Sequence, residues 1–382
     1  MRPSPDKADK EIIKGDQGRK MEKQRRRGTQ AVTIREVAAR AGVSSMTVSR
    51  VINKDEKVHE TTRALVEVAI KELNYVPNPA ARRLAGSDAL RIGLLYSNPS
   101  SAYLSELLVG ALDETSREGH QLIVERCAGT AKAQAAVTRL LAGGVNAFIL
   151  PPPLCEAKPI LDQLEQANVI AVVVAPGRPN AKLPTIRIDN YLAARQMTEH
   201  LLSLGHRRLG FIKGPRNQSA SEMRRRGFMD AVTDAGLDPD NILVEQGQFD
   251  YASGLGAAEK LLSNANRPTA IFAANDDMAA ATISVAHRMR LDVPGDLTVA
   301  GFDDTLIATT VWPPLTTIRQ PIAAMGKAAV SLLDSAMRAR WSTSGRREAP
   351  EQRLLAHKLV KRESTVPPPD TVKPAKPAIS QR

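Results

Sequence analysis

The sequence predicts an α/β protein with a small helical head at its N-terminus and two doubly wound subdomains after it. In residues 32–75 the apolar side chains recur at helical spacing, whereas from residue 90 short apolar runs alternate with amphipathic stretches. This alternation is typical of buried parallel strands joined by helices. The alternating part has about 270 residues, which is long for one domain of this kind, so two subdomains are expected.

The charge of the chain indicates a polyanionic partner near the N-terminus. The 382 residues include 53 Lys and Arg against 41 Asp and Glu, a net charge of +12. The first 90 residues contain 19 basic and 12 acidic side chains, so more than half of the excess lies there. A basic segment of this kind favours binding to nucleic acid.

Several classes of protein are disfavoured. Cys127 and Cys155 stand far apart and outside any CxxC pattern, which argues against a disulfide framework or a cysteine zinc site and favours a reducing compartment. No apolar run approaches the ~20 residues of a membrane-spanning helix. The first 30 residues are polar and lack the apolar core of a signal peptide. We therefore expect a cytoplasmic protein.

Composition predicts disordered ends. Residues 1–30 are expected to form a disordered basic arm, in which Met21 is an alternative start, and the Pro-rich residues 366–382 a disordered tail. The ordered parts are expected to be a head over 31–77, a linker over 78–89 and a large domain over 90–365.

Three short helices are predicted in the head. Thr33 is a suitable N-cap for the first helix. The apolar positions of that helix are Ile34, Val37, Ala38 and Ala41. Residues 42–44 break it, and the second helix is predicted over residues 45–52. The third helix is expected to begin at Thr61 or Thr62, and its apolar positions are Leu65, Val68, Ala69 and Leu73.

The first two helices and the turn between them are typical of a helix-turn-helix. The exposed start of the second helix carries side chains that can reach base edges and phosphates, namely Ser45, Met46, Thr47, Ser49 and Arg50. The alternative is an ordinary helical hairpin without a role in DNA binding.

In the large domain, short apolar runs predict the strands. These runs cover residues 92–96, 122–124, 147–150, 169–174, 208–212, 269–274 and 297–301. The first helices between them are expected near 103–118, 131–142 and 157–167. Doubly wound sheets bind ligands beyond the carboxyl ends of their strands. Residues 96–98, Asn275 and Asp303 follow such ends, so a ligand site is predicted there.

Longer motifs are present in both parts of the chain. The head contains Val32-Thr33-Ile34-Arg35-Glu36-Val37-Ala38, Ala41-Gly42-Val43-Ser44 and Thr47-Val48-Ser49-Arg50-Val51-Ile52-Asn53, followed by Leu73-Asn74-Tyr75-Val76-Pro77-Asn78 and Ala80-Ala81-Arg82-Arg83-Leu84-Ala85-Gly86. The large domain contains Asp189-Asn190, Gly205-His206, Arg224 with Gly227-Phe228, Ala274-Asn275-Asp276, Gly301-Phe302-Asp303-Asp304 and Pro314-Leu315-Thr316-Thr317-Ile318. In these motifs and in their order, the chain resembles the lactose-repressor (LacI) family of bacterial transcription regulators up to about residue 365. The resemblance implies a hinge helix within 78–89 and a two-lobed, periplasmic-binding-protein-like effector domain.

The resemblance also implies how DNA is bound. Two heads of a homodimer would each place the second helix in the major groove of an operator. The base-reading residues would be Ser45, Met46 and Arg50, and the phosphate-binding residues Thr33, Ser44, Ser49, Asn53 and Tyr75. The hinge, with Asn78 and Ala81, would fold on operator DNA, and its Leu84 would wedge into the minor groove. The alternative for Leu84 is a linker leucine packed on the next domain.

For the effector, the resemblance implies a site between the two lobes. The matching residues are Ser97, Asn98, Tyr103, Arg224, Phe249, Asn275 and Asp303. An aromatic face and Arg, Asn and Asp side chains suit a sugar, because they cover its C–H side and bind its hydroxyls. The alternatives are that Arg224 belongs to the solvated charge run 224–226, and that Phe249 belongs to the core.

The acidic pairs Asp276-Asp277 and Asp303-Asp304 could suggest a metal. We instead expect one inward, capping residue and one exposed residue in each pair, because no His or Cys completes a site. Enzymatic motifs are also weak: there is no G-x-S-x-G elbow, and Gly254-Leu255-Gly256 lacks a third glycine in register. No catalytic residue, metal or cofactor is therefore expected.

The function predicted from the sequence is a DNA-binding repressor controlled by a small carbohydrate, located with the bacterial nucleoid. It would act as a homodimer, since no leucine heptads follow residue 340 to form a larger assembly. Three alternatives remain: a regulator of the same family that responds to a nucleobase or a phosphoprotein, a transport-type sugar-binding protein, and an enzyme.

Overall fold

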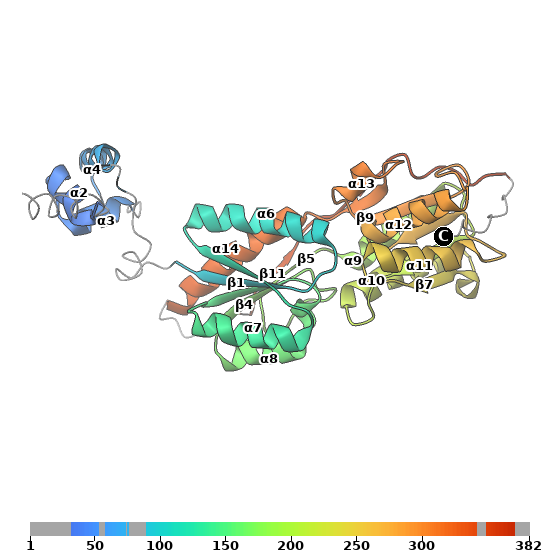
Figure 1. Cartoon of the computed structure of the whole chain (residues 1–382), viewed down its shortest axis with the longest axis horizontal. Coiled ribbons are helices and arrows are strands. Elements are labelled where there is room, and N and C mark those ends of the chain that lie inside the picture. Colours follow the sequence, from blue (N-terminus) through green and yellow to red (C-terminus); the bar gives the residue numbers. More distant parts are fainter. Residues whose placement is uncertain (1–31, 53–57, 74, 76–88, 342–348, 371–382) are drawn as a thin grey trace, which may run out of the picture. The chain divides into compact units, whose positions relative to one another are not determined.

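The structure is a computed structural model that describes residues 32–52, 58–73, 75, 89–341 and 349–370. It divides the chain into two compact units, Met1–Asp88 and Ala89–Arg382 (Figure 1). The described residues do not include the predicted basic arm or the predicted contact residues Asn53, Asn78, Ala81 and Leu84.

The described part of the first unit is a three-helix head. Its helices are α2 (Ile34–Ala41), α3 (Ser45–Ile52) and α4 (Glu60–Glu72). Gly42 ends α2 in a left-handed conformation (φ 68°), which glycine adopts without strain and which turns the chain into α3. The core of the head contains Val37, Ala38, Val48, Val51, Val66, Ala69 and Tyr75.

Two expectations for the third helix are wrong. It begins at Glu60, ahead of the predicted threonines. Leu65 and Val68, predicted to be on its buried face, are 59% and 56% exposed. The reason is a shift of the buried face: Val66 packs into the head core beside Ala69, which was predicted correctly.

The large unit contains two lobes, each built on a six-stranded sheet. The first sheet has the order β11-β5-β4-β3-β1-β2 and the second the order β12-β10-β9-β8-β6-β7. The elements of the first lobe are β1 (Arg91–Tyr96), α6 (Ser101–Glu118), β2 (Gln121–Arg126), α7 (Thr130–Ala142), β3 (Ala147–Leu150), η2 (Leu154–Glu156), α8 (Lys158–Gln166), β4 (Ile170–Val174), β5 (Thr185–Arg187), α14 (Ile322–Trp341) and β11 (Gln352–Leu354).

The second lobe repeats this arrangement. Its elements are α9 (Asn190–Ser203), β6 (Leu209–Lys213), α10 (Ser219–Asp234), η3 (Pro239–Asn241), β7 (Leu243–Gln246), α11 (Tyr251–Leu262), β8 (Ala270–Ala273), α12 (Asp276–Arg288), β9 (Thr298–Asp303), α13 (Ile307–Thr310), β10 (Thr316–Arg319) and β12 (Lys358–Val360). In both sheets the first strand of the lobe lies beside its second and third strands, which makes a topological switch point.

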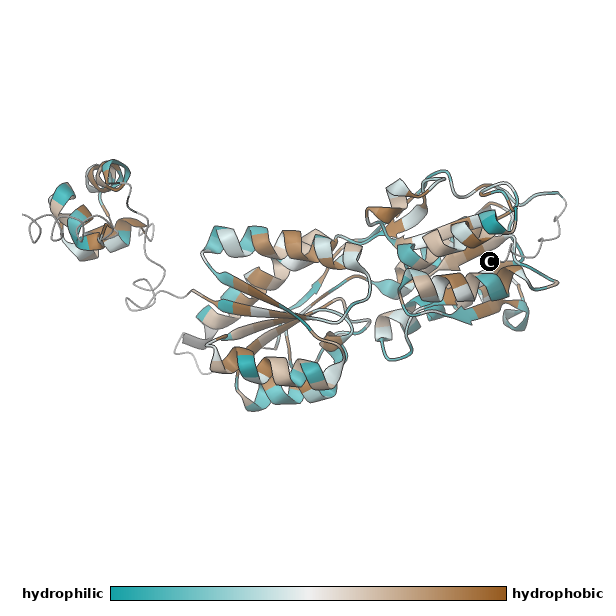
Figure 2. Cartoon of the chain, in the orientation of Figure 1, coloured by the Kyte–Doolittle hydropathy of each residue, from teal (hydrophilic) through white to brown (hydrophobic). Residues whose placement is uncertain are grey.

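Helices cover both faces of each sheet. In the first lobe α6 packs with α14, and α7 with α8 on the other face, as right-handed crossovers require (Figure 1). In the second lobe α9 packs with α10 and α11 with α12. The central strands β3, β4, β8 and β9 are apolar (Figure 2), because helices bury them from both sides. The prediction of two doubly wound subdomains is therefore confirmed.

The lobes are not consecutive in sequence. Among the described strands the chain passes from one sheet to the other three times, between β5 and β6, β10 and β11, and β11 and β12. Short strands from the C-terminal part thus complete both sheets. Several chain crossings of this kind link the two lobes into one domain.

The predicted start of the disordered tail is also wrong. Val366 donates its N–H to Thr298 Oγ1 (3.1 Å) and its carbonyl accepts a hydrogen bond from that hydroxyl. The same carbonyl lies 2.8 Å from Nε2 of the buried His206. The described structure continues to residue 370 because these bonds attach the segment to the second lobe.

The contact between α6 and α14 depends on two glycines. A Cβ atom on Gly326 would lie 2.2 Å from the carbonyl oxygen of Leu107, and one on Gly110 would lie 1.8 Å from that of Ala323. Gly326→Ala should therefore lower the free energy of unfolding by more than about 1 kcal/mol, since the helices must move apart.

Gly256→Ala is the matched control. A Cβ on Gly256 in α11 meets nothing within 4 Å. Alanine should stabilise this helix by about 0.5–1 kcal/mol. Denaturant unfolding of both variants checks the prediction, and similar shifts in the two would contradict it.

Candidate functional site

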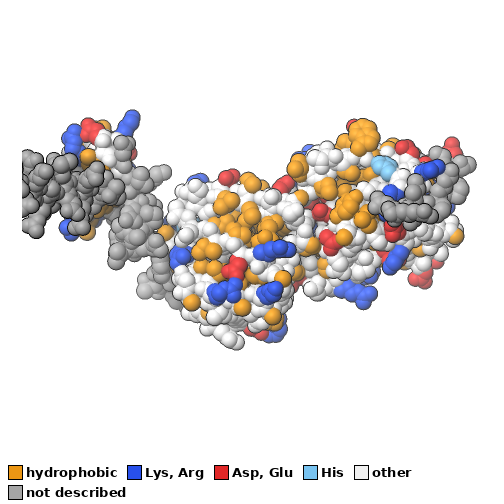
Figure 3. Space-filling model, viewed as in Figure 1, with side chains coloured by type: hydrophobic (Ala, Val, Ile, Leu, Met, Phe, Trp, Pro, Cys, Tyr) orange, Lys and Arg blue, Asp and Glu red, His pale blue; other side chains and the backbone are white. Residues whose placement is uncertain are grey.

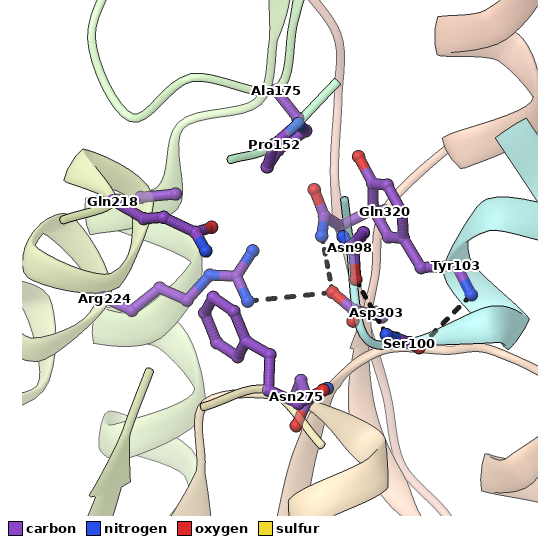
Figure 4. Close-up of a pocket in the computed structure, with 12 residues that line it drawn as sticks. Asn98, Ser100, Tyr103, Pro152, Ala175, Gln218, Arg224, Asn275, Asp303 and Gln320 are labelled. Atoms are coloured by element: carbon purple, nitrogen blue, oxygen red, sulfur yellow. Dashed lines mark hydrogen bonds and ion pairs between the residues drawn. The ribbon is translucent and has the colours of Figure 1, made fainter. Parts of the chain in front are cut away.

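The large unit encloses a small cavity between its two lobes, at the carboxyl ends of their strands (Figure 4). The cavity has a volume of about 30 Å³, which holds a few water molecules at most. It is lined by Asn98, Ser100, Tyr103, Pro152, Ala175, Gln218, Ala220, Arg224, Phe249, Asn275, Asp303 and Gln320. The first five belong to the first lobe, and the next six to the second; Gln320 lies where the chain passes from β10 to α14.

Arg224 enters the cavity from α10 and is 6% exposed. Its Nε donates to Asn190 Oδ1 (2.9 Å) and its Nη1 to the carbonyl oxygen of Ala274 (2.6 Å). The guanidinium carbon lies 3.6 Å from the ring centre of Phe302, a cation–π contact. Burial lowers the pKa of Arg224, and the nearby Asp303 carboxylate opposes this effect.

The neighbouring residues show why Arg224 is distinct from the rest of the charge run. Arg225 pairs with Glu222 and Arg226 with Asp230 along the outer face of α10. Arg224 points inward instead, since the helical period turns it toward the sheet. The alternative that Arg224 is part of a solvated face is wrong.

Asp303 lies at the end of β9, opposite Arg224. Its Oδ1 is 3.7 Å from Arg224 Nη1 and accepts a hydrogen bond from Gln320 Nε2 (2.6 Å). Burial raises the pKa of Asp303 to about 7, while Arg224 and the Gln320 bond act in the opposite direction. Its φ of 118° is a strained conformation for a residue other than glycine, and such strain is common at functional sites.

Phe249 and Asn275 form one wall of the cavity. Asn275 is the N-cap of α12: its side chain accepts from the Met278 N–H and donates to the Phe249 carbonyl oxygen (3.0 Å). Phe249 has a φ of 62°, and its ring lies against Gly214, where a Cβ would be 2.2 Å from the ring. These contacts fix the ring at the cavity surface.

Two buried polar atoms of the cavity residues have no hydrogen-bond partner: the Tyr103 hydroxyl and Gln320 Oε1. Tyr103 is 5% exposed and Gln320 3% exposed. Burial, followed by the proximity of Asp303, raises the pKa of Tyr103, so its hydroxyl keeps its proton. An unpaired buried polar group costs about 1–3 kcal/mol, so a ligand that supplies partners here gains affinity.

The structure brings together most of the predicted effector residues. Asn98, Tyr103, Arg224, Phe249, Asn275 and Asp303 line the cavity. Ser97 does not line it. The sequence reasoning missed Ser100, Pro152, Ala175, Gln218, Ala220 and Gln320; Gln320 follows the carboxyl end of a strand and could have been found by the rule that found Asp303.

The acidic pairs differ from expectation. Asp276 is inward, as predicted, and accepts from Thr305 N and Thr317 Oγ1. The second residue of each pair is not exposed, however: Asp277 is half-buried, and the Asp304 side chain is 3% exposed. Asp304 is buried because it pairs with Arg319 and Arg362.

Asp304 also lines a second, open groove of about 400 Å³. The groove is lined by Glu106, Asp304, Thr305, Leu306, Thr309, Arg319, Gln320, Pro321, Ile322, Ala323, Ala324 and Arg362. The two arginines of the groove, Arg319 and Arg362, already pair with Asp304, so they are less available to bind an anionic ligand. Within the described ranges, no group of three or more His, Cys, Asp or Glu side chains could hold a metal ion.

In the head, the turn residues cap the helices. Thr33 N and Oγ1 both donate to Glu36 at the start of α2, and these bonds lower the pKa of Glu36. Ser44 Oγ accepts from Thr47 N (3.0 Å) and lies 2.9 Å from Thr47 Oγ1, so it caps α3.

The remaining predicted DNA contacts differ in their exposure. Arg50 and Met46 are exposed, Met46 to 66%, while Ser45 and Ser49 are half-buried. Tyr75 is 8% exposed and packs into the head core, so little of its surface is accessible to a phosphate.

No helix in the described part of the chain is both long and apolar enough to cross a membrane.

Comparisons with known proteins agree on one family. Residues 33–78 match bacterial regulatory proteins of the lacI family, and residues 198–365 match the periplasmic binding protein-like domain. Over 307 residues the chain is 37% identical to the HTH-type transcriptional repressor PurR of Salmonella paratyphi B, which covers 79% of this chain and 89% of that protein.

Solved structures give the same answer. The fold is similar to a lac repressor dimer bound to operator and the anti-inducer ONPF, with 30% identity and a TM-score of 0.70 over 88% of this chain and all of that chain. It is also similar to a complex of the transcriptional regulator CelR with cellobiose, with 31% identity and a TM-score of 0.66 over 87% of this chain and all of that chain. The chain therefore belongs to the lacI family of bacterial regulatory proteins and is a DNA-binding transcriptional regulator.

Proposed function

We propose that this repressor is controlled by a small neutral carbohydrate that binds in the cavity between the lobes. The observation that carries this is the set of cavity groups: one buried ion pair, Arg224–Asp303, and two unpartnered atoms, the Tyr103 hydroxyl and Gln320 Oε1. The charges of the pair cancel while Asp303 is ionised, above its pKa of about 7, so the site then disfavours a strongly charged ligand. Sugar hydroxyls both donate and accept, and therefore suit all of these groups.

The test is a thermal-shift screen of the full-length protein against monosaccharides, disaccharides including cellobiose, and nucleobases. A ligand at 100 times its dissociation constant adds about 2.7 kcal/mol to stability. Stabilisation by a nucleobase and by none of the sugars would favour the nucleobase alternative, to which the likeness to PurR also draws attention.

For DNA, we propose that Ser45, Met46 and Arg50 of α3 contact base edges and that Thr33, Ser44, Ser49, Asn53 and Tyr75 hold phosphates. Thr47 of α3 is also proposed to contact the DNA. The support is that all of these residues of α3 belong to the second helix of the helix-turn-helix, with Ser45 and Met46 in its first turn and Arg50 in its last turn. Asn78, Ala81 and Leu84 are proposed to form the hinge contact in the minor groove.

We also propose that the protein acts as a homodimer through α6. Hydrophobic side chains gather over this helix in Figure 3, and its outer face carries Val109 (55% exposed) and Leu112 (51% exposed). Exposed apolar side chains on one helix face mark an interaction surface. Two heads in one dimer would match two operator half-sites.

Arg50→Ala should weaken binding to the operator by about 1–3 kcal/mol if Arg50 makes a bidentate base contact. Binding to random DNA should change far less. Arg40→Ala is the control, because Arg40 lies on α2 and pairs with Glu72. Fluorescence anisotropy at one fixed salt concentration measures both; equal losses on operator and random DNA would remove Arg50 from base recognition.

Arg224→Ala should weaken binding of the stabilising sugar by about 1.5–3 kcal/mol, because a charge-assisted hydrogen bond is lost. Arg225→Ala, which removes the neighbouring surface pair with Glu222, should leave it unchanged. Calorimetric titration of the sugar into both variants is the measurement. Equal sugar affinities in the two variants would show that Arg224 does not bind the sugar.

Effector affinity should depend on pH through Asp303. The ionised carboxylate accepts hydrogen bonds from hydroxyls, and its raised pKa of about 7 means that protonation competes with the ligand below neutral pH. Affinity should therefore be constant above about pH 8 and fall as the pH decreases through 7. Asp303→Asn should bind more weakly and show a flat profile between pH 5.5 and 8.5; a flat wild-type profile would contradict the assigned role.

Leu112→Asp should dissociate the dimer. An uncompensated charge buried in an interface costs about 3 kcal/mol or more, which is over a hundredfold in Kd. Leu192→Asp is the control, since Leu192 is 42% exposed on α9 of the other lobe. Sedimentation equilibrium distinguishes the two, and a dimer of unchanged strength in Leu112→Asp would place the interface elsewhere.

A further inference from the structure

Among the described residues, hydrogen bonds join the lobes directly at two places beside the cavity. Ser100 Oγ of the first lobe donates to Asp277 Oδ2 of the second lobe (2.7 Å). Ser219 of the second lobe donates its N–H to Glu156 Oε2 of the first lobe (2.8 Å), and its hydroxyl donates to the same carboxylate. Ser100 is the N-cap of α6, and Ser219 is the first residue of α10. Each lobe thus supplies a carboxylate to the N-terminal end of a helix in the other lobe.

The start of α10 depends on this contact. The first N–H groups of a helix have no partner within the helix and need a cap. The N-cap residue of α10 is Gln218, and its side chain makes no capping hydrogen bond. Glu156 provides the cap from the opposite lobe, and its negative charge suits the positive end of the helix dipole. Separation of the lobes would remove this cap.

Gly177 shows how closely the lobes approach at the same point. A Cβ atom on Gly177 would lie 2.2 Å from the carbonyl carbon of Ser219 and 2.3 Å from the amide nitrogen of Ala220. Gly177 is not among the glycines with a positive φ, so alanine is compatible with its own backbone. The obstacle to a side chain at 177 is therefore the backbone of the opposite lobe.

The helix held in this way is the one that carries the effector residues. Gln218 and Ala220 at the start of α10 line the cavity, and Arg224 follows about one turn later. Any movement of this helix end relative to the first lobe changes the geometry of the cavity. A ligand in the cavity would therefore meet groups whose positions depend on this helix end.

We propose that Glu156 and Gly177 are positioning residues: they form a latch across the lobes that holds α10, and with it Arg224, in the closed geometry. This inference rests on the proposed effector cavity. The latch sets the fraction of protein that is closed before the effector binds, and the apparent affinity of the effector scales with that fraction. The effector then needs to supply only part of the free energy of closure.

The test measures the distance between the lobes without any effector. Spin labels are placed at Lys132→Cys in α7 and Ser263→Cys after α11, both exposed positions, while the native Cys127 and Cys155 are buried. Glu156→Ala and Gly177→Ala are compared with matched controls in the full-length protein. The controls are Glu165→Gln, which lies in an exposed pair with Lys182, and Gly143→Ala, whose Cβ would meet neighbours only at 3.4 Å.

We expect both latch variants to shift the distance distribution toward a longer, open population, and both controls to match wild type. The open-to-closed ratio should rise about 2- to 30-fold in Glu156→Ala, the factor that corresponds to loss of a helix cap. Glu156→Gln keeps an acceptor oxygen and should be intermediate. Hydrogen exchange in residues 219–224 should accelerate in the same order, with thermal midpoints close to wild type.

Unchanged distances and exchange in both latch variants would overturn the proposal. If Gly177→Ala lowers the stability of the whole protein, Glu156→Ala alone decides the test. The Glu156 side chain is only half-buried, so its removal should not unfold the protein. These measurements need no ligand. The distance and exchange measurements can therefore support the latch even if no sugar binds. A sugar can likewise bind even if these measurements overturn the latch.

Discussion

The arrangement of the second lobe depends on a single buried guanidinium. The Arg224 and Asp303 side chains are each 7% exposed, and an isolated charge at this depth would be strongly destabilising. The structure compensates Arg224 with groups from three different elements: Asn190 of α9, the carbonyl of Ala274 after β8, and Asp303 of β9. These elements must therefore stay in register with α10. The groups that bind Arg224 also hold this wall of the cavity in place.

Two polar atoms of the cavity residues remain without a hydrogen-bond partner. The Tyr103 hydroxyl comes from the first lobe, and Gln320 Oε1 from the passage between the lobes. A ligand that pairs with both, and with the Arg224–Asp303 pair, interacts with both lobes at once. Such a ligand favours the closed arrangement over an open one, and a difference in affinity of this kind is what lets an effector shift a conformational equilibrium.

The head and the large unit are stabilised independently. The head has its own core around Val37, Val48 and Val66, and its helices are capped by their own turn residues, Thr33 and Ser44. The residues proposed to recognise DNA and those proposed to bind the effector thus belong to two separately packed units.

Local patterns in the sequence determined much of this protein. Helical spacing and the break at Gly42 predicted the helix-turn-helix, and continuous apolar runs predicted the central strands of both lobes. Polar residues directly after those runs, Asn275 and Asp303, predicted the cavity, because parallel strands end at a common edge. Each of these features depends on a few neighbouring residues or on a rule that holds for every doubly wound sheet.

Only the tertiary structure decided the features that depend on distant partners. The short strands β5, β7, β10, β11 and β12 have three or four residues each and carry little periodicity; they are strands because a neighbouring strand pairs with them. Val366 is held by Thr298, and Leu65 and Val68 are exposed because Val66 and Ala69 fill the head core. The contact of Glu156 with Ser219 joins residues 63 positions apart. The physical reason is the same in each case: the stabilising group lies far away in the sequence, so no local pattern records it.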